Sequence, residues 1–170
     1  MKTFTDANGR SWTLTLNLGT AMAVKARLDI DLLQPEQGDS SGGPPLLTRL
    51  GTDEMLLGEV LCVMLEGQFA VHKVTEDDVR ACFDGQTLLS AQKAFYEELI
   101  SFFQSRGRKD RAKAVAKQMA MIDAAVTAIE TKIDALDLQS ILDQTIQTGG
   151  GAMSGDLQEA SDSDQASSGN

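Results

Sequence analysis

The sequence holds 170 residues, 42% of them hydrophobic, and its formal net charge at pH 7 is −10. That length suits one domain with a tail, and the acidic balance argues against general binding to nucleic acid or to anionic lipid. No run approaches the roughly 18 apolar residues of a membrane span, and no signal peptide opens the chain. We therefore expect a soluble cytoplasmic protein in which Cys62 and Cys82 are free core thiols rather than a disulfide.

The N-terminus has the alternation of a β-hairpin. Trp12, Leu14, Leu16 and Leu18 alternate with Thr13, Thr15 and Asn17, which is the period of a half-buried strand, so we expect the hairpin to cover residues 1–18. The preceding Asp-Ala-Asn-Gly at residues 6–9 supplies a turn and lacks the spaced oxygen ligands of a calcium loop. A lone hairpin is only marginally stable, so we expect its Trp12 face to pack on helices. Residues 20–28 predict a short helix within an N-terminal region of residues 1–33.

Prolines, glycines and serines dominate residues 34–48, which predict a flexible loop. Its Gly-Gly pair lacks the lysine of a phosphate-binding loop. Residues 49–147 predict a helical domain. Capping residues and apolar spacing there predict three helices ahead of the longest one: after Asp53, from Thr75 to Phe83, and from Thr87 to Gln104.

The longest predicted helix covers about residues 108–136 and has heptad-like apolar spacing. Seven apolar residues follow one another at intervals of 4-3-4-3-4-3, the spacing of a coiled-coil seam: Val115, Met119, Ile122, Val126, Ile129, Ile133 and Leu136. The favoured interpretation is an internal helical hairpin, in which the seam packs on the preceding helix. The alternative is an interface for a second copy or for a partner's amphipathic helix.

The C-terminal end changes character. A last helical piece is predicted over residues 138–146. Residues 148–170 contain no lysine, arginine or aromatic residue and are rich in glycine, serine and aspartate, which predicts a disordered acidic tail. The whole chain is therefore predicted to be mainly α with a short N-terminal β-hairpin, as a helical bundle with a long C-terminal helix.

A basic cluster surrounds the start of the long helix: Arg106, Arg108, Lys109, Arg111, Lys113 and Lys117. The simpler explanation is a set of solvated first turns. The alternative is a docking patch for an acidic partner or for the protein's own acidic tail. Positive charge at a helix N-terminus opposes the helix dipole, which favours a functional explanation.

The chain offers little for catalysis. His72 is its one histidine, which excludes a multi-histidine metal site, and we expect it in a polar surface connector with no nucleophile motif. The acidic pairs Asp77/Asp78 and Glu97/Glu98 are expected on solvated helix faces rather than in acid–base roles. We accordingly predict no enzyme activity, no cofactor, and no catalytic or metal-binding residue.

Residues 4–33, FTDANGRSWTLTLNLGTAMAVKARLDIDLL, resemble the opening of small proteins encoded among phage and prophage tail genes. These proteins begin with a D-x-x-GR-x-W hairpin and continue to a hydrophobic-D-L-L segment. The matching residues are Asp6, Gly9, Arg10 and Trp12, then Ile30, Asp31, Leu32 and Leu33. The stretches LTRLGTDEMLLGEVLCVML and VTEDDVRACFDGQTLLSAQKAFYEELISFF, the latter ending in Phe102 and Phe103, are also similar to this group.

Such proteins are tail assembly chaperones, and the resemblance covers about residues 1–105. It implies a protein of the host cytoplasm that binds the tape measure protein, helps tail tube subunits assemble around it, and is absent from the finished virion. Some members also have a longer form made by ribosomal frameshifting. The alternative is a structural virion component such as a head–tail connector.

The family has no ligand residues to carry over to this chain. The candidate protein-binding residues therefore come from the seam and the basic cluster: Val115, Met119, Ile122, Val126, Ile129, Ile133, Arg106, Arg108, Lys109 and Arg111.

Overall fold

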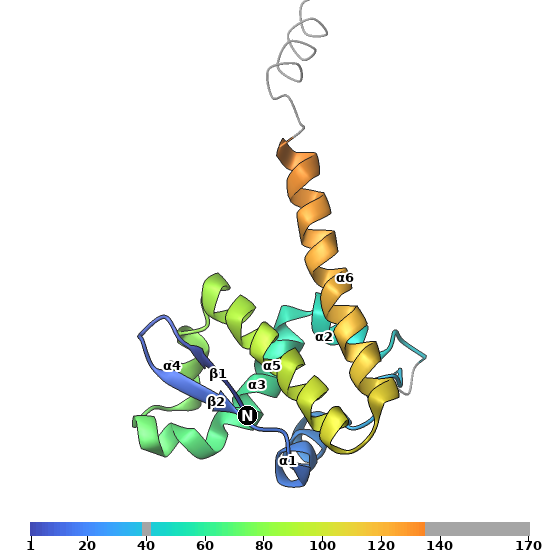
Figure 1. The fold of residues 1–170 in the computed structure, drawn as a ribbon. Coiled ribbons are helices and arrows are strands. Elements are labelled where there is room, and N and C mark those ends of the chain that lie inside the picture. Colours follow the sequence, from blue (N-terminus) through green and yellow to red (C-terminus); the bar gives the residue numbers. More distant parts are fainter. Residues whose placement is uncertain (39–41, 135–170) are drawn as a thin grey trace, which may run out of the picture. The chain divides into compact units, whose positions relative to one another are not determined.

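The computed structural model describes residues 1–38 and 42–134 and confirms the predicted fold class (Figure 1). The described part is mostly helical and opens with a two-stranded antiparallel hairpin. The elements are β1 (Lys2–Thr5), β2 (Ser11–Leu14), α1 (Leu18–Leu28), α2 (Leu46–Thr52), α3 (Glu54–His72), α4 (Glu76–Ala81), α5 (Gly85–Ser105) and α6 (Lys109–Asp134). Contacts divide the chain into two units, Met1–Ala128 and Ile129–Asn170. The predicted helical piece over residues 138–146 and the acidic tail lie outside the described residues.

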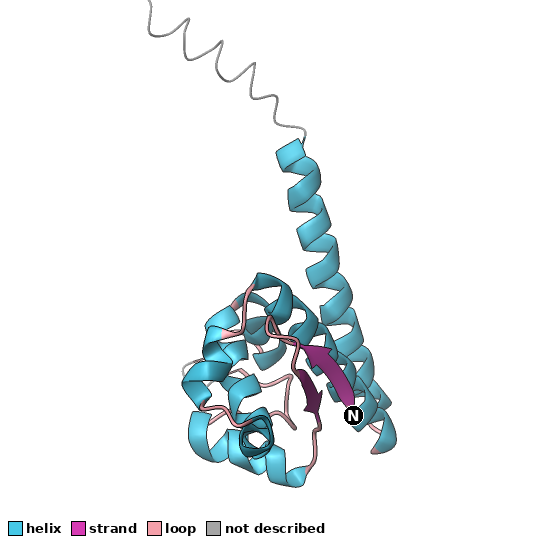
Figure 2. Cartoon of the chain, turned by 90° about the vertical axis from the view of Figure 1, so that its left-hand side faces the viewer, coloured by secondary structure: helices cyan, strands magenta, loops and turns pink. Residues whose placement is uncertain are grey.

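The hairpin packs its apolar face on helices, as predicted, but it is shorter than the predicted residues 1–18. β2 ends at Leu14, and the Asn17 cap starts α1 at Leu18, which is 63% exposed. Phe4 pairs with Trp12 across the two strands, and both side chains are buried with Leu14. The Trp12 ring meets Phe69 edge-on, with ring centroids 6.1 Å apart, and lies 4.5 Å from the ring of His72. The strands therefore lie among the helices of the first unit, where β1 contacts α5 and β2 contacts α3 (Figure 2).

His72 and Glu98 are the two polar residues whose surroundings the sequence predicted wrongly. His72 ends α3 and is half-buried against Trp12, so it does not lie in a polar connector. Glu98 is buried, and its Oε1 accepts a hydrogen bond from the Leu16 amide at 3.0 Å. Its Oε2 lies 2.8 Å from the amino group of Met1. Glu98 therefore joins the hairpin to α5 instead of facing solvent.

Local capping explains where the helices begin. Asp53 accepts a hydrogen bond from the Leu56 amide at the start of α3, as predicted. Thr75 and Asp78 form the predicted capping box of α4, although α4 ends at Ala81 rather than at Phe83. Each cap satisfies an amide that has no partner within its own helix.

The predicted loop over residues 34–48 is shorter in the structure. α2 begins at Leu46, where the side chains of Leu46 and Leu47 turn into the core. The Leu46 amide donates to the Gln37 carbonyl at 2.9 Å, and the Leu47 amide donates to the Pro35 carbonyl at 3.2 Å. These bonds draw the two ends of the segment together. Residues 39–41, between them, lie outside the described residues.

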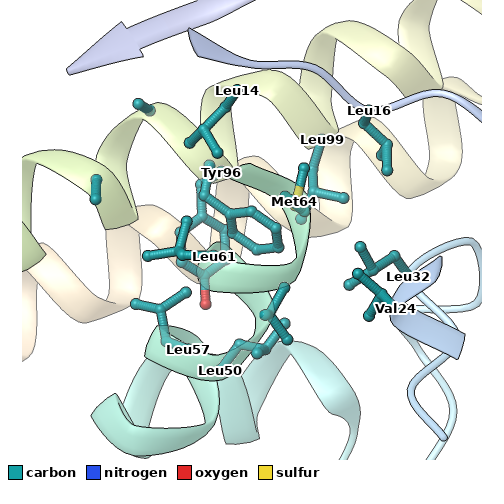
Figure 3. Close-up of a cluster of buried hydrophobic side chains, with 14 of the residues drawn as sticks. Leu14, Leu16, Val24, Leu32, Leu50, Leu57, Leu61, Met64, Tyr96 and Leu99 are labelled. Carbon is teal, nitrogen blue, oxygen red and sulfur yellow. The ribbon is translucent and has the colours of Figure 1, made fainter. Parts of the chain in front are cut away.

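α3 is the central helix of the core, in contact with the hairpin, α1, α2, α4 and α5. Figure 3 shows Leu57, Leu61 and Met64 of α3 among buried side chains from β2, α1, α2, α5 and the connecting segments: Leu14, Leu16, Val24, Leu32, Leu50, Tyr96 and Leu99. By length and mean hydropathy α3 alone, among the described helices, would be long and apolar enough to cross a membrane. In this fold Leu57, Val60, Leu61, Met64 and Leu65 of α3 lie in the core, whereas Met55 and Val71 are exposed. Cys62 on α3 and Cys82 are both buried free thiols, as predicted.

Candidate protein-binding surface

The predicted seam on α6 divides into a buried and an exposed part. Val115 is fully buried in the core, and Met119 and Ile122 are half-buried against it. One turn further, 49% of Val126 is exposed. The first part of the seam is therefore internal packing, in line with the favoured interpretation, and Val115 is not available to a partner.

The last residues of the seam lie in the second unit. There Ile129 and Ile133 are 58% and 60% exposed. Leu136 lies outside the described residues. From Val126 onward, the described apolar positions of the seam are exposed, which keeps the alternative interpretation, an interface, open for this part.

Ile122 marks the last close contact of the seam with the core. A Cβ added at Gly51 of α2 would lie 2.7 Å from Cδ1 of Ile122 and 3.3 Å from the hydroxyl of Tyr96. A side chain at position 51 would therefore require the end of the Ile122 side chain to move away from α2. Tyr96 is buried, and its hydroxyl donates to the Leu47 carbonyl at 3.1 Å. Burial raises the pKa of Tyr96 to about 12.

Two open grooves lie between α5 and α6. One, of about 350 Å³, is lined by Gln86, Leu89, Ser90, Gln92, Lys93, Tyr96, Met119, Ile122 and Asp123. The other, of about 470 Å³, is lined by Ile100, Gln104, Lys109, Ala112, Lys113 and Ala116. We call these two sets of residues together the α5–α6 furrow. Along α6 the furrow reaches from residue 109 to 123, which at 1.5 Å per residue is about 21 Å.

The furrow has an apolar floor and a charged rim. Ile100, Met119 and Ile122 are half-buried in it, and Leu89 is 58% exposed. Exposed lysines on both helices form most of the rim, and Asp123 lies at the other end of the α6 side. An amphipathic helix binds in such a groove by inserting apolar side chains at intervals of three and four residues. The furrow has the length and polarity for such a helix.

Sequence reasoning missed the α5 side of the furrow. Leu89, Lys93, Tyr96 and Ile100 follow one another at 4-3-4 intervals, which is the same spacing as the seam on α6. This was the signal that could have identified them. A stronger apolar stripe on the same helix, formed by Phe95, Leu99 and Phe103 in the core, made this weaker pattern easy to overlook.

The arginines of the basic cluster contact the protein itself. Arg111 donates to the Leu33 carbonyl and to the Glu36 carboxylate, and its guanidinium lies 5.9 Å from the centre of the Phe103 ring. Arg108 binds Asp110 through two hydrogen bonds of 3.0 and 2.6 Å. These bonds hold the pKa of Asp110 well below its usual range. The Arg111 side chain therefore anchors α6 to the segment after α1, and its role as a docking residue stays a prediction.

The remaining members of the cluster are more accessible. Arg106 caps α5 at its C-terminus, and its guanidinium lies 6.0 Å from the centre of the Phe102 ring. Lys109, Lys113 and Lys117 are exposed along α6. A partner can reach these three lysines, and also Arg106 and Arg108, because all five are exposed.

Within residues 1–38 and 42–134, no group of three or more histidine, cysteine, aspartate or glutamate side chains is placed to hold a metal ion. The sequence matches no family model and no curated protein, and the fold matches no solved structure.

Proposed function

We propose that this protein is a non-catalytic tail assembly chaperone that binds the tape measure protein in the host cytoplasm. The observation that carries the proposal is the α5–α6 furrow, together with an apolar seam that leaves the core after Ile122 and continues exposed at Val126. The resemblance of residues 1–105 to tail assembly chaperones supplies the identity of the partner. The furrow supplies a place for one of its helices.

The furrow fits a particular kind of helix. Its apolar floor suits side chains at intervals of three and four residues, and each partly exposed leucine or valine covered by the partner contributes on the order of 1 kcal/mol. Lys109 and Lys113 at one end of the furrow favour acidic residues on the partner helix, and Lys93 with Asp123 at the other end favours a pair of opposite charges there. The partner helix is therefore amphipathic and about 14 residues long where it lies in the furrow.

Charged substitutions on the two parts of the seam test this proposal. Val126→Asp places a carboxylate at an exposed position, so the variant should fold as the wild type does and lose co-purification with the tape measure protein. Ile122→Asp should unfold the first unit, because it buries a charge against Gly51 and Tyr96. Ala124→Asp, at an exposed position on the opposite side of α6, is the matched control and should bind normally.

A folded Val126→Asp variant that still co-purifies with the tape measure protein, together with a Leu89→Asp variant that does the same, would refute the proposal. Mass spectrometry of purified particles separates it from the structural alternative. A chaperone should be absent from finished particles, whereas a head–tail connector should be present.

A further inference from the structure

A groove with an acidic rim lies between α3, α4 and α5, away from the furrow. Met55, Phe83 and Leu88 form its apolar lining, and Glu54, Glu59 and Arg80 stand beside them around a volume of about 310 Å³. We call it the acidic groove. Met55 is 80% exposed at its edge.

The acidic groove has an excess of negative charge. Arg80 is the groove's one cation, and it already forms an ion pair with Glu76. Glu54 and Glu59 are exposed, and neither forms an ion pair with any residue of the described ranges. The caps of α3 and α5, Asp53 and Asp84, add two further exposed carboxylates directly before Glu54 and after Phe83.

The exposed lysines of α6 give that helix an excess of positive charge. Lys109, Lys113 and Lys117 recur every four residues, so they lie on one side of the helix about one turn apart. All three are exposed, and within the described residues none of them is in an ion pair. The groove beside Lys109 and Lys113 is floored by Ile100 and by alanines. This basic face therefore combines positive charge with an apolar recess.

We infer that the acidic groove of one copy of the chain binds the basic face of α6 of a second copy. The lysines would pair with Glu54 and Glu59, and Met55 would enter the recess floored by Ile100. The two surfaces share no residue, so both can be occupied in one molecule. The net charge of −10 does not prevent this contact, because at physiological ionic strength charges more than about 8 Å apart are screened and neighbouring charges dominate.

Such a contact joins two different surfaces, so it is head-to-tail and adds copies in a ring or a chain instead of closing as a two-fold dimer. The inference does not depend on the proposed function. Self-association would nevertheless affect the proposed binding of a partner helix, because Lys109 and Lys113 also belong to the rim of the furrow. Self-association and binding of a partner helix would then compete for the same two lysines.

Charge reversal on each surface tests the inference in the full-length chain. By analytical ultracentrifugation, the wild type at physiological ionic strength should exceed the 18.2 kDa mass of one chain as its concentration rises, and should return towards that mass in high salt. Glu54→Lys with Glu59→Lys places lysines against lysines, and Lys109→Glu with Lys113→Glu places carboxylates against carboxylates. Each double variant should associate at least about tenfold more weakly than the wild type. All four side chains are exposed, so folding should be unaffected.

Restoration of the contact is the decisive measurement. A chain that carries all four reversals has complementary surfaces again and should associate, as should a mixture of the two double variants. Either double variant associating as strongly as the wild type would overturn the inference, as would a wild type that stays at the mass of one chain at physiological ionic strength. If association appears only after residues 149–170 are deleted, the acidic tail rather than a second copy covers the lysines, and the inference is also wrong. Failure here leaves the Val126→Asp test of partner binding unaffected.

Discussion

Asp6 holds the turn of the hairpin together, and removing its carboxylate should be costly. Its Oδ1 accepts hydrogen bonds from the amides of Asn8 and Arg10, both at 2.9 Å. Its Oδ2 accepts from the indole Nε1 of Trp12 at 2.9 Å and lies 3.1 Å from Nε of Arg10. Asp6 itself is buried. One carboxylate thus satisfies four donors.

The magnitude follows from which donors are left without a partner. In Asp6→Ala the Asn8 and Arg10 amides can turn to water, since both residues are partly exposed. The indole N–H of Trp12 cannot reach water, because Trp12 is only 1% exposed. A lost hydrogen bond to a charged acceptor costs about 1.5–3 kcal/mol, and a buried donor left unsatisfied costs about 1–3 kcal/mol. Both costs describe the same Trp12–Asp6 bond in part, so they do not add in full. We therefore expect a loss of about 3–4 kcal/mol in the free energy of unfolding.

The contribution of Asp6 should also depend on pH. Burial opposes ionisation, but the hydrogen bonds from Trp12, Arg10 and Asn8, with the charge of Arg10, outweigh it and lower the pKa of Asp6 below its ordinary value. A lowered pKa in the folded state stabilises the protein fully above the unfolded value of about 3.9. That stabilisation is lost as the pH falls from there through the folded pKa. The difference between the wild type and Asp6→Asn should therefore be constant near neutrality and shrink below about pH 4.

Urea unfolding followed by the fluorescence of Trp12, the only tryptophan, measures both effects. Asp78→Ala is the control, because Asp78 also accepts backbone and side-chain hydrogen bonds but is exposed in the capping box of α4. The control should lose clearly less stability than Asp6→Ala. Equal losses in the two variants would show that burial of the Asp6 carboxylate does not increase its contribution to the free energy of unfolding. A difference from Asp6→Asn that stays unchanged in acid would refute the pH argument.

Four further results are expected. Trp12→Ala should lower the free energy of unfolding by about 3–5 kcal/mol, measured by circular dichroism, and a cost near zero would mean that the hairpin is a free arm. His72→Ala should leave co-purification with the tape measure protein intact, and a folded variant that fails to bind would contradict a purely structural role. Tyr96, the single tyrosine, should ionise near pH 12 in the folded protein when followed by ultraviolet absorbance. Stability should accordingly fall as the pH rises from about 10 towards 12, and Tyr96→Phe should remove that part of the dependence. Deletion of residues 149–170 should reduce solubility more than the urea midpoint, and slow hydrogen exchange in those residues would refute the predicted disorder.

The parts of the fold that the sequence predicted well are those decided by neighbouring residues. A capping box needs only Thr75 and Asp78, three positions apart, and a half-buried strand needs only alternation around Trp12. The capping box lies where the pattern predicted it, and the strand is present but ends at Leu14 instead of Leu18. A capping box depends only on a few consecutive backbone amides, whereas the hairpin also needs the helices on which it packs.

Burial of polar groups and the division of the seam depend on distant residues, which no local pattern reports. Glu98 is buried because the Leu16 amide lies beside it, 82 positions earlier in the chain. The seam leaves the core after Ile122 because α5 begins at Gly85 and its first turn is polar, so no apolar layer remains for the next turn of α6. Heptad spacing shows which side of a helix is apolar, but not where its partner helix ends.

The residues that carry the resemblance to tail chaperones all have structural roles in this fold. Asp6 bonds the turn, Gly9 has a positive φ of 77° that favours glycine, Arg10 pairs with Asp6, and Trp12 fills the core. These four residues hold the hairpin together, so they do not by themselves select a partner. Partner choice must then lie elsewhere, on side chains that folding does not require. The exposed Leu89 and Val126, with the lysines of the furrow rim, meet that condition, which is why the decisive substitutions belong on α5 and α6 rather than in the hairpin.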